Sequence, residues 1–161
     1  MQTPSFKLVF ICAFIALAVL GVSVAMALDL PSGRPLGLIF TQAHLESVFS
    51  TYSPDDKSAQ LWILTRIDMA IPFAYGAFLY FASQRYATAP WVFLLVFWTM
   101  IGMIFDFTEN ATVLEILEGE DGFALKTILT RAKFAFLTVP LLYCSASFAK
   151  ELLTGKKPKK R

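Results

Sequence analysis

A short polar stretch inside an apolar run is the part of this chain best suited to chemistry. Asp106, Glu109 and Asn110 interrupt the apolar run between Trp91 and Ile116. Their spacing of i, i+3 and i+4 places all three on one face of a helix. If that helix crosses a membrane, each charge near the bilayer centre costs roughly 3 kcal/mol to insert. The polar face must therefore meet water, a ligand or another polar group.

The chemistry open to this face is acid–base chemistry or hydrogen bonding. A carboxylate beside a lysine in a low-dielectric site can act as a base. In that interpretation Asp106 or Glu109 is the base, and Lys133 is its charge partner. Asn110 and Tyr75 would supply hydrogen bonds. No nucleophile–base pair and no metal-ligand spacing accompanies them, so the reaction stays open, and neither a metal nor a cofactor is expected.

The composition is that of an integral membrane protein. Of the 161 residues, 57% are hydrophobic and 16% are charged, whereas soluble domains are about 25% charged. The predicted fold is all-α, a bundle of four transmembrane helices in one domain. The only basic run is a short tail, so nucleic acid is not an expected partner. Membrane lipid is the expected surrounding.

Hydrophobic runs and helix-start signals place the four predicted helices. They cover about 7–28, 54–83, 90–117 and 123–152, within a membrane domain of residues 1–152 followed by a basic tail at 153–161. Ser53 and Pro54 form a strong helix start, with Ser53 as cap and Pro54 at the first helical position. Within the second helix, Pro72 removes one backbone hydrogen bond, which frees the carbonyl of Asp68.

Two parts of the first 60 residues allow more than one interpretation. Residues 1–27 also resemble a cleavable signal peptide, because Ala25-Met26-Ala27 has the pattern of a cleavage site. The long first loop carries a rough helical stripe that predicts a short amphipathic helix. His44, the only histidine, lies on it as a secondary candidate for proton transfer or ligand binding, or as an ordinary surface residue.

The distribution of Lys and Arg predicts the topology. Lys7, Arg85 and the tail carry most of the basic residues near the predicted helix ends, whereas the two acidic connections carry few. Since cytoplasmic loops are enriched in Lys and Arg, both termini are predicted to be cytoplasmic. The two acidic loops then face the outside.

The polar residues of the predicted helices are expected to lie at similar depths in the membrane. At 1.5 Å rise per residue, Asp68 lies about 10 Å and Asp106 and Lys133 about 15 Å below the outer surface, with Lys126 near that surface. Arg66 and Arg131 are secondary candidates, because each lies two residues from a more inward position and can reach toward the interface. The predicted polar cluster comprises Asp68, Tyr75, Asp106, Glu109, Asn110 and Lys133.

Three functions fit such a cluster. The first is a pocket that binds, or acts on, a lipid-like or amphipathic small molecule. The second is a structural or accessory subunit, in which the charges form an ion-pair network or pair with a membrane-protein partner or a second copy of the chain. The third is a small proton-coupled transporter, for which four helices are few unless the protein oligomerises.

Two motifs resemble those of a family of small, largely uncharacterised four-helix membrane proteins. They are Arg66-Ile67-Asp68…Pro72…Tyr75-Gly76 and Asp106-Phe107-Thr108-Glu109-Asn110. That family carries an Asp…Pro…Tyr helix and an Asp-x-x-Glu-Asn helix, and the resemblance covers Leu61 to about Leu117. It implies a four-helix fold and no particular activity. The architecture also has a looser likeness to the sterol-isomerase and sigma-2-receptor-like fold, which holds lipid-like ligands among its helices.

Overall fold

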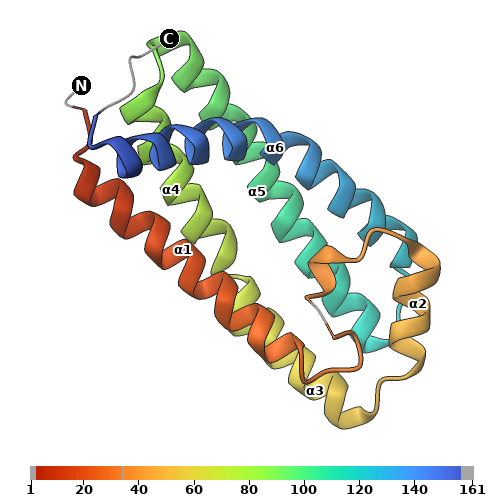
Figure 1. Ribbon diagram of the computed structural model, residues 1–161. Coiled ribbons are helices and arrows are strands. Elements are labelled where there is room, and N and C mark those ends of the chain that lie inside the picture. The colour runs from red at the N-terminus through yellow and green to blue at the C-terminus, as the bar shows by residue number, and fades with distance from the viewer. Residues whose placement is uncertain (1–2, 34, 157–161) are drawn as a thin grey trace.

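The described part of the chain is all-α, as predicted. The computed structural model describes residues 3–33 and 35–156, and these contain no β-strand. The long helices are α1 (Phe6–Ala27), α4 (Ile71–Tyr86), α5 (Ala89–Glu118) and α6 (Phe123–Thr154), and they run side by side as a bundle in Figure 1. Three of them, α1, α5 and α6, are long and apolar enough to cross a membrane.

The second predicted helix, 54–83, is not continuous. It is divided into α3 (Pro54–Ile63), a π-helix η2 (Leu64–Asp68) and α4. The amide of Met69 bonds to the carbonyl of Leu64 over 3.2 Å, five residues back. Pro72 lies just beyond and lacks the amide that would bond to the carbonyl of Asp68. With 16 residues, α4 is about 24 Å long, short of a full crossing by itself.

The start of α3 follows from local chemistry. The hydroxyl of Ser53 accepts from the Asp56 amide, and the Asp56 carboxylate accepts from the Ser53 amide, which makes a reciprocal cap. Pro54 occupies the first turn, as predicted. The Ser53 hydroxyl also donates to the same Asp56 carboxylate, 2.6 Å away.

The first loop contains the predicted short helix and one turn more. α2 (Gln42–Ser50) buries Leu45, Val48 and Phe49, and a 3₁₀ turn η1 (Leu36–Leu38) precedes it. Figure 1 shows α2 and α3 at one end of the bundle, opposite the start of α1 and the end of α6. This loop therefore covers one end of the helices.

One ion pair ties the other end of the bundle together. The guanidinium of Arg85 at the end of α4 binds the Glu151 carboxylate on α6, with Nε 2.8 Å from Oε2. Its Nη1 donates to the carbonyl of Pro4, 2.7 Å away, ahead of α1. α6 continues through Thr154, past the predicted end at 152, and most of the predicted tail lies outside the described residues.

Candidate functional site

α5 turns its polar face inward. Asp106, Glu109 and Asn110 are all buried, and Glu109 is only 1% exposed. Their helical spacing aims them at the same neighbours, α4 and α6, because α5 packs against both. The cost of burying these groups is therefore met inside the protein, by partners on the neighbouring helices.

Two lysines of α6 neutralise the two carboxylates. Lys133 Nζ lies 2.9 Å from Asp106 Oδ1 and 2.6 Å from Glu109 Oε2. Lys126 Nζ lies 3.2 Å from Glu109 Oε1 and is fully buried. The two lysines are seven residues apart, which is two turns of one helix face. These four residues form a charge-balanced group that we call the ion-pair cluster.

Hydroxyl groups complete the coordination of both carboxylates. Tyr75 OH donates to Asp106 Oδ2 over 3.0 Å, and Thr130 Oγ1 donates to Glu109 Oε1 over 2.6 Å. Each of the four carboxylate oxygens thus has a cation or a donor. These charges can be buried in a low-dielectric interior because none of them is left without a partner.

Asp68 lies beside the ion-pair cluster without a lysine of its own. Its Oδ1 accepts from Ser23 Oγ of α1 over 2.7 Å. Its backbone carbonyl, freed by Pro72, accepts from Asn110 Nδ2 over 3.3 Å. Among the described residues no Lys, Arg or His lies within ion-pair distance of this carboxylate. π-helical turns are frequent at functional sites, and this one presents Asp68.

Cations of α6 also hold the first loop in place. Lys126 donates to the carbonyls of Leu36 and Ile39, the second over 2.9 Å. Arg131 donates to the carbonyl of Phe40, with Nη2 2.9 Å away. A Cβ on Gly37 would lie 3.4 Å from Lys133 Nζ and 3.8 Å from Glu109 Oε1, so the loop lies directly against the ion-pair cluster. Residues 35–40 therefore form a cover over the cluster.

Below this cover lies a cavity of about 470 Å³, which we call the central cavity. This size is within the usual ~300–1,000 Å³ range for small-molecule sites. Its polar lining near the cover consists of Ser23, Asp68, Tyr75, Asp106, Asn110 and Lys133. The rest of its wall is mostly apolar and extends along α1 and α6 as far as Phe148.

The central cavity opens sideways between α1 and α6. Leu17 and Leu20 of α1 line it and are 69% and 44% exposed. On α6, Ser145 lines it and is also exposed. A residue that both lines a cavity and is accessible from outside marks its mouth. Phe148 closes the far end by stacking on Phe6, with ring centroids 5.6 Å apart.

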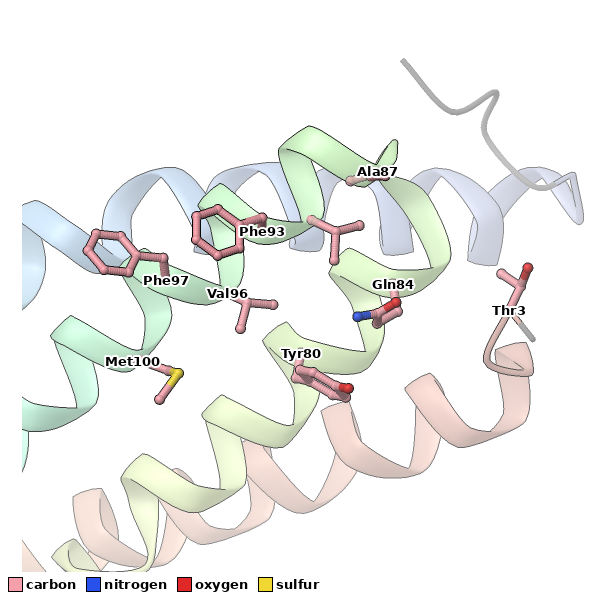
Figure 2. A pocket seen from close by; sticks show the side chains of 10 residues that line it. Thr3, Tyr80, Gln84, Ala87, Phe93, Val96, Phe97 and Met100 are labelled. Carbon is pink, nitrogen blue, oxygen red and sulfur yellow. The ribbon is translucent and has the colours of Figure 1, made fainter. Parts of the chain in front are cut away.

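A second hollow, of about 500 Å³, lies near the end of the bundle that carries the Arg85–Glu151 pair. Figure 2 shows Phe93 and Phe97 of α5 along it, with Tyr80 and Gln84 of α4 on its other side. None of its lining residues is charged. It is therefore a weaker candidate for recognising a polar ligand than the central cavity.

The structure brings the six residues of the predicted polar cluster together. Five line the central cavity, and Glu109 lies directly behind Asp106 and Lys133. Of the secondary candidates, Arg131 binds the loop, whereas Arg66 and His44 are exposed and line neither hollow.

Three contributors were missed by sequence reasoning: Ser23, Lys126 and Thr130. The sequence places Lys126 near the outer surface in depth and outside the polar cluster; in the structure the first loop covers it completely and it pairs with Glu109. Its seven-residue spacing from Lys133 was the available signal. Ser23 and Thr130 carry no such signal, because a lone hydroxyl in an apolar run is common.

Comparisons with other proteins add nothing to this geometry. No family model, no curated protein and no solved structure matches the chain. Within residues 3–33 and 35–156, no group of three His, Cys, Asp or Glu side chains is placed to hold a metal ion.

Proposed function

We propose that this chain is an integral membrane protein that binds one lipid-like, amphipathic molecule in the central cavity. The observation that carries the proposal is the combination of a polar end, built from Asp68, Asp106 and Lys133, with a long apolar wall. Small-molecule sites are usually concave and mostly apolar, with a few convergent polar groups. A molecule with one polar end and a hydrocarbon body matches both parts.

In this proposal the chain crosses the bilayer four times, with both termini cytoplasmic. In chain order the second of these crossings is the segment α3–η2–α4, and the other three are α1, α5 and α6. α4 packs between α1 and α5, both of which are long enough to span. Arg85 joins the start of α1 to the ends of α4 and α6, and cytoplasmic ends are rich in such basic residues.

The sideways mouth of the central cavity supports entry from the bilayer. Leu17 and Leu20 at the mouth are apolar and exposed, so lipid would contact them directly. The loop cover at residues 35–40 and the Phe6–Phe148 stack close the two ends. A membrane-dissolved molecule would slide in between α1 and α6 with its polar end toward Asp68.

Native mass spectrometry of the gently extracted protein tests this function. The wild-type protein should carry a bound amphipathic species, and Ala16→Trp should lose it because Ala16 lines the central cavity. The matched control is Ala18→Trp, which adds the same side chain at an exposed position of α1 that does not line it. Equal occupancy in both variants, or no species in the wild type, would contradict the proposal.

A purely structural role is the second candidate. It is favoured by the ion-pair cluster, in which every carboxylate oxygen is already paired within the protein. Such a network could serve only to set the helix register. The structural role does not account for the 470 Å³ cavity or for Asp68, which stands outside the network.

A further inference from the structure

Among residues 3–33 and 35–156, the formal charges around the central cavity do not balance. Asp68, Asp106 and Glu109 supply three negative charges, and Lys126 and Lys133 supply two positive charges. Both lysines are used by Asp106 and Glu109. The remaining negative charge belongs to Asp68.

The Asp68 carboxylate is placed to accept a ligand. Only Oδ1 has a donor among the described residues, the hydroxyl of Ser23. Oδ2 has none, and it is not sealed off, since the side chain lines the central cavity and is half-buried. A carboxylate in a low-dielectric site with one neutral donor is poorly compensated, and a cation beside it would restore the balance.

Other kinds of polar end suit this site less well. A carboxylate or phosphate would face Asp68 and Asp106 together, and Lys133 already binds two carboxylates. A neutral hydroxyl could donate one hydrogen bond but would leave the negative charge in place. A protonated amine donates hydrogen bonds and cancels the charge at once.

The apolar wall selects for a long hydrocarbon body. Along α6 the lining runs from Lys133 to Phe148, fifteen positions, or about 22 Å at the helical rise. Phe78, Leu137 and Leu141 supply apolar surface along this length. The polar end of the cavity lies at one extreme of this wall, so head and chain are separated along one axis.

We propose that the ligand of the central cavity is a long-chain amine whose cationic nitrogen lies against Asp68, beside the ion-pair cluster. This inference rests on the function proposed above and adds the sign of the ligand's charge. Tyr75 and Asp106 form the neighbouring wall, already bonded to each other. Asp68 is then a binding residue, and Ser23 positions its carboxylate.

The test compares three probes of equal chain length on the full-length protein in an uncharged detergent. Dodecylamine, dodecanol and dodecanoate are added separately, and bound probe is measured by native mass spectrometry together with the shift in melting temperature. Dodecylamine should bind at least about tenfold more tightly than dodecanol, the size expected of one charge-assisted hydrogen bond. Dodecanoate should bind least.

Two variants test whether Asp68 is the source of the preference for dodecylamine. Asp68→Asn keeps the shape of the side chain and should reduce the preference for dodecylamine over dodecanol to near unity. Asp121→Asn is the matched control, because it removes one carboxylate charge from an exposed loop and should leave the preference unchanged. Circular dichroism checks that both variants are folded, and the comparison of the three probes on the wild-type protein needs no variant.

The outcomes separate the two proposals. If dodecanol binds the wild-type protein as well as dodecylamine does, or if Asp68→Asn keeps the amine preference, the cationic ligand is wrong and the binding cavity stands. Tightest binding of dodecanoate would show that the sign of the charge is wrong. If none of the three probes binds, and the extracted wild-type protein carries no species that Ala16→Trp removes, the binding function itself is overturned.

Discussion

At the scale of single residues, the stability of the protein depends on the balance of buried charges in the ion-pair cluster. Lys133 bridges Asp106 and Glu109, and Lys126 holds the second oxygen of Glu109. Removing one partner of a buried pair leaves a charge without compensation, whereas removing an acid and a base together keeps the sum unchanged. The ion-pair cluster should therefore respond to mutation in a pattern that single exposed charges do not show.

We expect Lys133→Met to lower the free energy of unfolding by about 3–5 kcal/mol, because the buried Asp106 carboxylate then has no cation beside it, while Glu109 keeps only Lys126. The double variant Lys133→Met/Asp106→Asn should recover much of this loss, since Glu109 keeps Lys126. Thermal melts of the purified variants measure both effects.

The control for this pair of variants is Lys57→Met, which removes an exposed lysine from α3. Its effect should stay within about 0.5 kcal/mol. If the double variant melts no higher than Lys133→Met alone, charge compensation is not what keeps these residues in place.

At the scale of helices, close approach decides where the polar groups meet. A Cβ on Gly102 of α5 would lie 2.5 Å from Leu137 Cγ of α6, and one on Gly76 of α4 would lie 2.6 Å from Met103 Sδ. Small residues at such crossings let helix backbones come together. Gly102 lies one turn before Asp106, so this crossing sets the distance between Asp106 and Lys133.

Gly102→Ala should destabilise the protein by about 1–3 kcal/mol, because the added methyl overlaps Leu137. Gly21→Ala is the matched control: it lies in α1 with nothing within 4 Å of the added Cβ, so it should be neutral or stabilise by up to about 1 kcal/mol. Melting temperatures of the two variants test the difference. Equal shifts would show that the α5–α6 crossing is looser than the structure indicates.

At the scale of the whole molecule, the two ends of the bundle differ in chemistry. One end has the Arg85–Glu151 pair beside the start of α1. The other has the loop cover and the acidic turn between α5 and α6. The central cavity lies nearer the second end at its polar extreme, so the proposed orientation puts the polar site in the outer half of the bilayer.

Cysteine labelling tests that orientation. In a background with Cys12→Ala and Cys144→Ala, Asp55→Cys and Glu120→Cys should react with a membrane-impermeant reagent from outside. Ala89→Cys should react only after permeabilisation; Ala89 is exposed at the start of α5, whereas the neighbouring Arg85 is engaged by Glu151. Labelling of Ala89→Cys in intact cells would show that the topology is the reverse of the one proposed.

The first helix should be retained in the mature protein. α1 packs against α4, lines the central cavity and supplies Ser23 to Asp68. Its removal after Ala27 would open one whole side of the cavity. Intact-protein mass spectrometry should therefore give a mass that includes α1, and a mass lacking residues 1–27 would show that this segment is a signal peptide.

Features that depend on a few neighbouring residues could be predicted from the sequence alone. The shared face of Asp106, Glu109 and Asn110 follows from helical geometry. The start of α3 at Ser53 and Pro54 follows from capping chemistry. Each of these needs only residues within one or two turns, so no knowledge of distant segments is required.

The tertiary structure decided which partners these groups meet. Lys126 is buried because a loop about 90 positions away folds over it and presents the carbonyls of Leu36 and Ile39. Ser23 reaches Asp68 across 45 positions because α1 packs beside η2. The central cavity exists where α1 and α6 stay apart while α5 and α6 approach closely at Gly102. Burial, charge pairing and empty space all depend on how distant segments pack together. Local periodicity and spacing carry no information about that packing.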